Sequence, residues 1–256
     1  MSGLLLRLAG PLQSWGERSA FTPVRDSAPF PTRSALTGIL AAAEGLGRSE
    51  EGIDRYDRFQ FTVRVDRPGT RLVDYHTVGG GFPKAQTAAT SGGSNKGAAV
   101  ITRRHYLADA VFTIAVTGPD ADTDRIAKAL RHPHWAPYLG RRSCAPDEPF
   151  LLRAHVADPV HELRHRVPLS RPLARSEPET VPVTFLYEQP PADVPDNEID
   201  VLDANDHPVS FAPHQRSHRT RRIYRVEHRL AHSLACPRQE LMDQLITYCL
   251  EEDNAA

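Results

Sequence analysis

Hydrophobic and polar residues alternate in several stretches of the chain, and these stretches flank a region with almost no apolar residues. Residues 72–76 alternate with a period of two, residues 100–105 resume an extended pattern, and residues 112–116 alternate again, which predicts β-strands. Residues 79–97 are rich in glycine, serine and threonine and cannot bury enough apolar surface to form a core. Two strands are therefore expected to carry a long projection, an insertion at about residues 77–102.

The elements on either side of this projection follow from the same periodicities. Residues 4–8, 59–65 and 150–156 are expected to form strands. Two helices are expected between them, with their ends marked by capping residues. The first starts at Thr32 or Ser34 and stops at Gly45 or Gly47, and the second runs from Asp120 or Asp122 to Leu130.

The order strand, helix, strand, projection, strand, helix, strand is typical of a ferredoxin-like split βαβ fold, an α+β class with both helices on one face of an antiparallel sheet. The other face, toward which Arg7 and Arg64 should point, is then free for RNA or for a second layer. Taken singly, each arginine is expected to be solvated.

The chain after about residue 156 has a different character, because prolines interrupt its short apolar stretches. We expect a ferredoxin-like domain over residues 1–156 and a β-rich region over residues 157–256, which ends in a helix at 238–252. The basic stretch HRTRRIYRVEHRLAH fits either a strand that contacts a phosphate backbone or an edge strand that its charges protect from aggregation.

Composition limits the possible functions. The 256 residues carry a net charge of −1, so any nucleic-acid surface must be a local patch. The three cysteines are far apart and form no CxxC pair, which excludes a zinc ribbon, makes a disulfide framework unexpected and fits a reducing cytoplasm. The longest apolar runs are too short to span a membrane.

Aromatic and basic residues gather at the base of the projection, and lysines lie toward its tip. Flexible backbone with aromatics and cations suits the binding of a phosphodiester strand, although an unstructured surface loop is the alternative. The start of the first helix, beside Arg33, offers either an anion site or an exposed arginine. The residues at the base are Tyr75, His76, Arg103, Arg104, His105 and Tyr106, and those toward the tip are Lys84 and Lys96.

One motif is typical of a different function, that of a zinc protease. Residues 161–165 match the zinc-protease motif HExxH, but Pro159 and Pro168 leave room for barely two helical turns. A short surface helix is the better interpretation, and neither the P-loop spacing nor the GxSxG motif occurs in the chain.

Five stretches, in the same order along the first 150 residues, resemble one family of CRISPR-associated proteins. The family comprises subunits of the type I-E CRISPR surveillance complex, Cascade, and belongs to the repeat-associated mysterious protein (RAMP) superfamily. The stretches are LRLAGPLQSWG (6–16), FPTRSALTGILAAAEG (30–45), DYHTV (74–78), RRHYLADAVFTIAV (103–116) and PYLGRRSC (137–144).

The resemblance implies a ferredoxin-like (RRM-like) domain whose projection is a β-hairpin called the thumb. It implies a non-catalytic role in antiviral defence, without a cofactor, as the subunit that holds the 5′ handle of CRISPR RNA. One copy per complex, not a homo-oligomer, would cap the filament of the backbone subunit CasC and adjoin the large subunit CasA. The RNA-binding residues that it implies are Arg33, Ser34, Tyr75, His76, Thr77, Lys84, Arg103, Arg104, Tyr106, Gly140, Arg141 and Arg142.

A metal-independent endoribonuclease is the alternative function, because some relatives in other CRISPR subtypes cut repeat RNA themselves. Such cleavage needs a base, an acid and a cation at the phosphate, and Tyr75, His76, His105, Tyr106 and Lys84 have suitable side chains. Type I-E systems, however, use a separate subunit, CasE, for this step. We therefore expect binding without cleavage.

Overall fold

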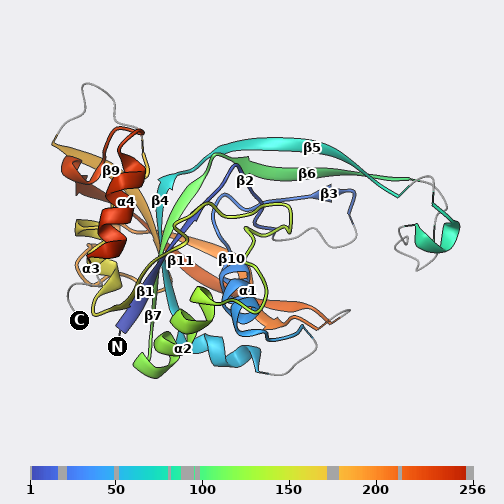
Figure 1. Cartoon of the computed structure of the whole chain (residues 1–256), viewed down its shortest axis with the longest axis horizontal. Coiled ribbons are helices and arrows are strands. Elements are labelled where there is room, and N and C mark those ends of the chain that lie inside the picture. The colour runs from blue at the N-terminus through green and yellow to red at the C-terminus, as the bar shows by residue number, and fades with distance from the viewer. Residues whose placement is uncertain are drawn as a thin grey trace.

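The computed structural model describes residues 2–16, 22–48, 52–79, 82–87, 95, 99–171, 179–212 and 215–251. These residues form a mixed α/β structure with mostly antiparallel sheets (Figure 1). The main sheet has seven described strands in the order β10-β11-β9-β4-β7-β1-β8. Their bounds are β1 (Ser2–Ala9), β4 (Gln60–Arg67), β7 (Val111–Gly118), β8 (Leu151–Val156), β9 (Thr180–Tyr187), β10 (Asp200–Ser210) and β11 (Ser217–Ala231).

One face of this sheet is covered by α1 (Arg33–Glu44) and α2 (Asp120–Arg131), as the sequence predicts. The Thr32 side chain caps the start of α1 by accepting a hydrogen bond from the N–H of Ala35 at 3.3 Å. Gly45 ends α1 with a φ of 79°, a left-handed conformation that glycine adopts without steric cost. Of the alternatives for each end of this helix, the chain uses Thr32 and Gly45.

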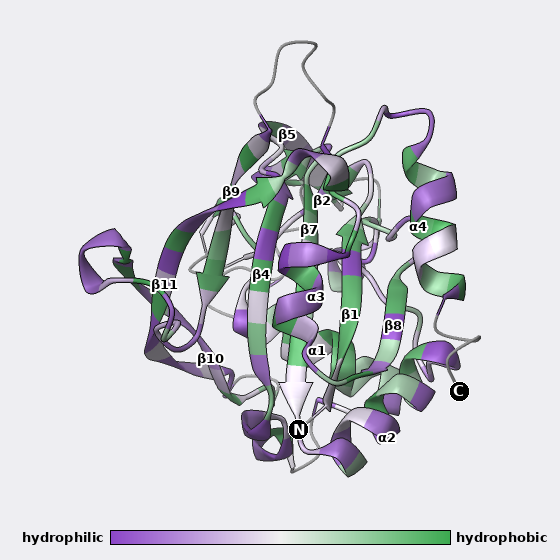
Figure 2. Cartoon of the chain, turned by 90° about the vertical axis from the view of Figure 1, so that its left-hand side faces the viewer, coloured by the Kyte–Doolittle hydropathy of each residue, from purple (hydrophilic) through white to green (hydrophobic). Residues whose placement is uncertain are grey.

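The opposite face holds a second layer, formed by α3 (Pro159–His165) and α4 (Leu241–Leu250). Figure 2 shows α3 lying across β4, β7 and β1, with α4 beside β8. The HExxH segment lies within α3, a helix of seven residues capped by Asp158, whose side chain accepts from the N–H of His161 at 2.9 Å. Since both faces are covered, nearly every residue of β1 is buried, not only every second one.

The expectation that Arg64 is solvated is wrong. Its side chain is completely buried, and its guanidinium donates to both carboxylate oxygens of Asp66, at 2.6 and 3.0 Å. It also donates to three backbone carbonyls in and after α3, those of Leu163, Val167 and Pro168, at 2.7–2.9 Å. A charge can lie in the core only when its donors are satisfied in this way. Arg7, also expected in solvent, is likewise buried on this face.

The C-terminal half of the chain extends the same sheet. Strand β9 pairs with β4, where Arg64 faces Phe185, and β10 and β11 form a hairpin that completes the sheet edge. Strands from both expected regions therefore share one sheet. Helix α4 is shorter than the predicted 238–252, of which residue 252 lies outside the described residues, and its stripe packs through Leu245 and Tyr248.

The thumb is a ribbon of two strands, β5 (Thr70–Val78) and β6 (Val100–Ala108), which stands far out from the main sheet (Figure 1). The two strands pair without interruption from Thr70 opposite Ala108 to Val78 opposite Val100. On its other edge β6 pairs with β2 (Leu12–Gln13) and β3 (Val24–Arg25). Lys96, expected near the tip, lies outside the described residues.

Short 3₁₀ helices complete the described elements. They are η1 (Ile53–Arg58), η2 (Lys84–Gln86), η3 (Asp196–Glu198) and η4 (His232–Leu234). In the described ranges no helix is long and apolar enough to cross a membrane.

The buried pair predicts a large stability effect. Arg64→Ala leaves the Asp66 carboxylate and three carbonyls without their donor, so the free energy of unfolding should fall by about 3–5 kcal/mol. Arg58→Ala is the matched control: this exposed arginine pairs with Asp122 at 3.3 Å, and such surface pairs contribute about 0–1 kcal/mol. Urea unfolding of both variants checks this, and equal losses would contradict a structural role for Arg64.

Candidate nucleic-acid interface

The pairing of β5 with β6 sorts the predicted thumb residues onto two faces of the ribbon. Directly paired residues share a face, and successive pairs alternate between faces. Tyr75 pairs with Arg103, whereas Asp74 pairs with Arg104 and Leu72 with Tyr106. One side, the Tyr75 face, therefore carries Tyr75, Thr77 and Arg103, and the other, the Tyr106 face, carries His76, Arg104 and Tyr106.

The Tyr106 face meets the loop that contains Gly140, Arg141 and Arg142. The guanidinium of Arg141 lies 5.2 Å from the centre of the Tyr106 ring, a distance typical of cation–π contacts. Its Nε donates to Ser14 Oγ at 2.9 Å, and that hydroxyl donates to the carbonyl of His105 at 2.9 Å. The structure thus brings together two regions that lie 35 residues apart in the sequence.

Gly140 allows this loop to approach the chain just after β2 closely. Its φ is 84°, and a Cβ at this position would lie 1.8 Å from the carbonyl oxygen of Ser14. The loop is held by hydrogen bonds from the N–H of Ser14 to the carbonyl of Leu139 at 3.0 Å and from the N–H of Cys144 to that of Arg141 at 2.8 Å. Only glycine fits such a contact, which fixes Arg141 above Tyr106.

Positive charge accumulates on this side of the thumb base. Burial lowers the pKa of Arg141, and the nearby charges of Arg104 and Arg25 lower it further. In the described part of the chain, no carboxylate oxygen lies within 4 Å of the side-chain nitrogens of Arg103, Arg104, Arg141 or Arg142. Three arginines that repel one another, Arg25, Arg104 and Arg141, therefore lie near one another on this side of the thumb base, with Asp74 opposite Arg104 in the ladder.

The Tyr75 face is more open and more apolar. Tyr75 is 65% exposed, and Val73 and Ile101 beside it are also exposed. On the opposite face, His76 Nδ1 lies 3.3 Å from Asp74 Oδ2 of the same strand. Tyr75 and His105 therefore lie on one face and His76 and Tyr106 on the other, so the candidate acid and base groups do not form a single cluster.

The start of α1 is built differently from the expectation of an open anion site. The backbone N–H of Arg33 donates to Asp206 Oδ2 at 2.7 Å, so the anion at this helix end is a carboxylate of the chain itself. The Arg33 side chain is only 4% exposed and forms an ion pair with Glu188. Ser34 is buried as well.

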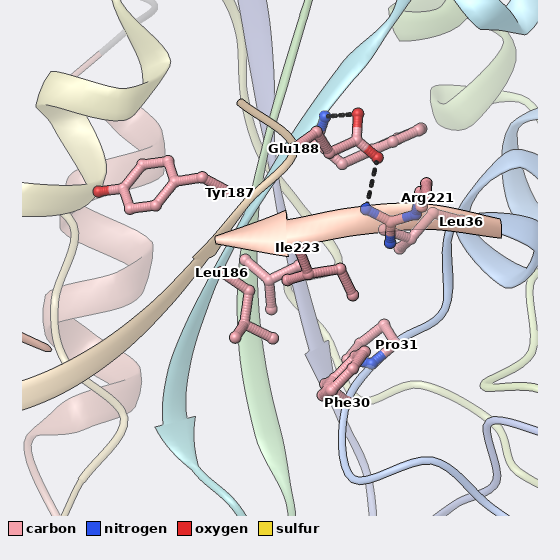
Figure 3. Close-up of a pocket in the computed structure, with 10 residues that line it drawn as sticks. Phe30, Pro31, Leu36, Leu186, Tyr187, Glu188, Arg221 and Ile223 are labelled. Carbon is pink, nitrogen blue, oxygen red and sulfur yellow. Dashed lines mark hydrogen bonds and ion pairs between the residues drawn. The ribbon is translucent and has the colours of Figure 1, made fainter. Parts of the chain in front are cut away.

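Glu188, just after β9, connects this helix start to the last strands. It accepts a hydrogen bond from the N–H of Phe61 at 3.1 Å, and it pairs with Arg221 of β11 at 3.3 Å (Figure 3). The adjoining pocket between Phe30, Leu36 and Ile223 has a volume of only about 10 Å³, room for a single water. Arg33 and Ser34 therefore serve packing here and are not presented to a ligand.

The predicted residues thus fall into separate groups. Arg104, Tyr106, Gly140 and Arg141 form one site, with exposed Arg142 at its border. Arg33 and Ser34 are elsewhere and buried, and Lys84 is exposed in η2 beyond the end of the ribbon.

Sequence reasoning missed two members of this site, Ser14 and Arg25. Ser14 could have been found from the LQSWG stretch, because Trp15 next to it is an anchor. The Trp15 ring is fully buried and its Nε1 donates to Gln13 Oε1 at 3.2 Å, so Trp15 packs in the core. Arg25 carried no sequence signal, because only the parallel pairing of β3 with β6 places it beside Arg104.

Comparisons with known proteins agree with one another. A family model described as CRISPR-associated protein (Cas_Cas5) matches residues 3–224. The chain is 36% identical over 193 residues to the CRISPR system Cascade subunit CasD of Escherichia coli K12, covering 70% of this chain and 83% of that one.

Two solved structures are similar over nearly the whole chain. A chain of a CRISPR RNA-guided surveillance complex is 48% identical with a TM-score of 0.84, covering 97% of this chain and 99% of that chain. A Cas protein crystal structure is 28% identical with a TM-score of 0.61, covering 92% and 97%. The family resemblance of the five sequence stretches is confirmed: this chain belongs to the Cas5 family of CRISPR-associated proteins.

Proposed function

We propose that this chain is the non-catalytic CRISPR RNA-binding subunit of a type I-E Cascade surveillance complex in antiviral defence. The observation that carries the proposal is the pair of arginines at the thumb base: Arg141 lies over the buried Tyr106 ring, Arg104 is close enough to lower its pKa, and neither has a carboxylate partner among the described residues. Such cations suit contacts with the phosphates of a single-stranded RNA. Membership of the Cas5 family and similarity to CasD support this role.

The topology supports a ferredoxin-like core within this architecture. Numbered by chain order, the first, second, third and fourth strands of the N-terminal region are β1, β4, β7 and β8. Their order in the sheet is second, third, first, fourth, all antiparallel, with α1 and α2 on one face. This is the arrangement expected of a split βαβ fold, and residues 157–256 would be its β-rich extension.

In this proposal the thumb base holds the 5′ handle of the guide RNA. Arg104, Arg141 and Arg142 contact phosphates, and Gly140 lets the backbone come close to the strand. Tyr75, Thr77 and Arg103 contact the RNA or the next subunit from the opposite face, and Lys84 reaches farther along the guide. Arg33 and Ser34 are assigned instead to the packing of α1.

The partners follow from the same assignment. One copy of the chain would cap the filament of the backbone subunit CasC and adjoin the large subunit CasA, in the cytoplasm. The exposed apolar residues of the Tyr75 face, Val73 and Ile101, offer a surface for such a neighbour.

Binding without cleavage is the first expected result. The purified chain, without metal, should shift a labelled CRISPR repeat RNA in a binding assay and leave it intact on a denaturing gel. The expectation rests on the similarity to CasD. Each face of the ribbon carries one histidine and one tyrosine, Tyr75 with His105 and His76 with Tyr106, so a cleavage test is needed on both. Cleavage at one position that is lost in His76→Ala or Tyr106→Ala would make the alternative, an endoribonuclease, correct.

Charge removal at the loop should weaken RNA binding. Arg141→Ala combined with Arg142→Ala should raise the Kd and reduce the slope of log K against log salt by about 1.4, because each phosphate contact to a single strand contributes about 0.7. The matched control is Arg229→Ala with Arg238→Ala, which removes the same charge at exposed positions outside the thumb base. Equal slopes in both double variants would exclude the loop from the RNA site.

A further inference from the structure

A second cluster of basic and aromatic residues begins at the C-terminal end of α1. Two backbone hydrogen bonds hold the segment after α2 at this helix end. The N–H of His134 donates to the carbonyl of Ala43 at 2.9 Å, and the N–H of Trp135 donates to the carbonyl of Ala42 at 3.2 Å. The Trp135 side chain nevertheless remains 45% exposed. Arg48 follows the same helix end and is also exposed. An exposed indole and an exposed guanidinium therefore lie at one end of α1.

The end of the β10–β11 hairpin supplies the other half of this cluster. Ser210 pairs with Ser217, and Pro208 with His218, so residues 211–216 form the connection. Within it the guanidinium of Arg216 lies 5.9 Å from the centre of the Phe211 ring. Figure 1 shows this hairpin running beside α1 on the side from which the thumb also projects.

The charges of this cluster repel one another. Partial desolvation of its guanidinium lowers the pKa of Arg216 although the residue as a whole is exposed, the positive charge of Arg48 lowers it further, and Tyr138 raises it. Burial and the Arg216 charge likewise lower the pKa of His218. No described carboxylate lies within salt-bridge distance of Arg48 or Arg216.

The carboxylate that acts on His218 is Asp206, and it is already engaged. It binds the guanidinium of Arg221 at 2.6 and 3.0 Å and the backbone N–H of Arg33 at 2.7 Å. Among the described residues, no carboxylate therefore neutralises Arg48 and Arg216.

The loop of residues 138–142 lies between this cluster and the thumb base along the chain. Tyr138, at its start, raises the pKa of Arg216, and Arg141, three residues later, stacks on Tyr106. The tight turn at Gly140 joins these two positions. An RNA strand bound at the thumb base would cross this loop to reach the second cluster.

We propose that Arg48, Arg216 and His218, with Trp135, Tyr138 and Phe211, form a second binding surface for the same single-stranded RNA. The inference rests on the proposed function, since it extends the RNA path from the thumb base to the β10–β11 hairpin. The two arginines contact phosphates, and the exposed Trp135 ring offers a base a stacking surface. Binding of a polyanion would relieve the repulsion between these cations and add a salt-dependent contribution to the affinity.

The test uses the full chain and a labelled synthetic CRISPR repeat RNA. Arg48→Ala combined with Arg216→Ala should weaken binding and reduce the salt slope by about 1.4, the amount expected for two phosphate contacts to a single strand. Arg229→Ala with Arg238→Ala again serves as the control of equal charge. Both arginines of the test pair are exposed, so thermal unfolding should match that of the wild type.

A hydroxyl-radical footprint of the bound RNA gives the second measurement. The Arg48/Arg216 variant should lose protection over one part of the site and keep the part that the Arg141/Arg142 variant loses. If the Arg48/Arg216 variant has the same footprint and salt slope as the control variant, the second surface is overturned. The proposed function still stands in that case, provided that the wild type binds the RNA. Unchanged RNA binding with impaired assembly into the complex would show that this surface holds a protein neighbour instead. A wild-type chain that protects no RNA would count against both proposals.

Discussion

The carboxylates of Glu188 and Asp206 hold the start of α1 against the last strands of the main sheet, and much of the structure depends on these contacts. Glu188 pairs with Arg33 and Arg221, and Asp206 accepts from the backbone of Arg33 while it binds Arg221. A helix N-terminus attracts an anion, and here the chain supplies its own. The contacts attach the β10–β11 hairpin to α1.

The arginines of this chain belong to two populations with different physical roles. Buried ones, such as Arg33, Arg64 and Arg153, are surrounded by carboxylates and carbonyl oxygens, because an unpaired charge in the core costs several kcal/mol, on the order of the whole stability of a domain. Those at the surface of the thumb base, such as Arg104 and Arg141, have no such partner in the described part of the chain. This division explains how a chain of net charge −1 can still present a local surface for a polyanion.

The pairing between β5 and β6 gives the thumb two chemically different faces. Because paired residues share a face and successive pairs alternate, the ribbon presents two different surfaces. The Tyr106 face is joined to the Gly140 loop and carries cations, whereas the Tyr75 face is open and carries Val73 and Ile101. A shift of the register by one residue would exchange these two surfaces.

The sequence by itself determined the elements of the N-terminal half, the existence of the thumb and the family, because periodicity, capping residues and short motifs are local properties. It also identified Gly140, Arg141 and Tyr106 as candidates. Only the tertiary structure decided which arginines reach the surface. Arg33 and Arg64 carry the same charge as Arg104 and Arg141, and their burial depends on Glu188, Asp206 and α3, which lie about 100 to 170 residues farther along the chain. Contacts over such separations leave no periodic signal, so the second layer and the pairing of β9 with β4 could not be read from spacing alone.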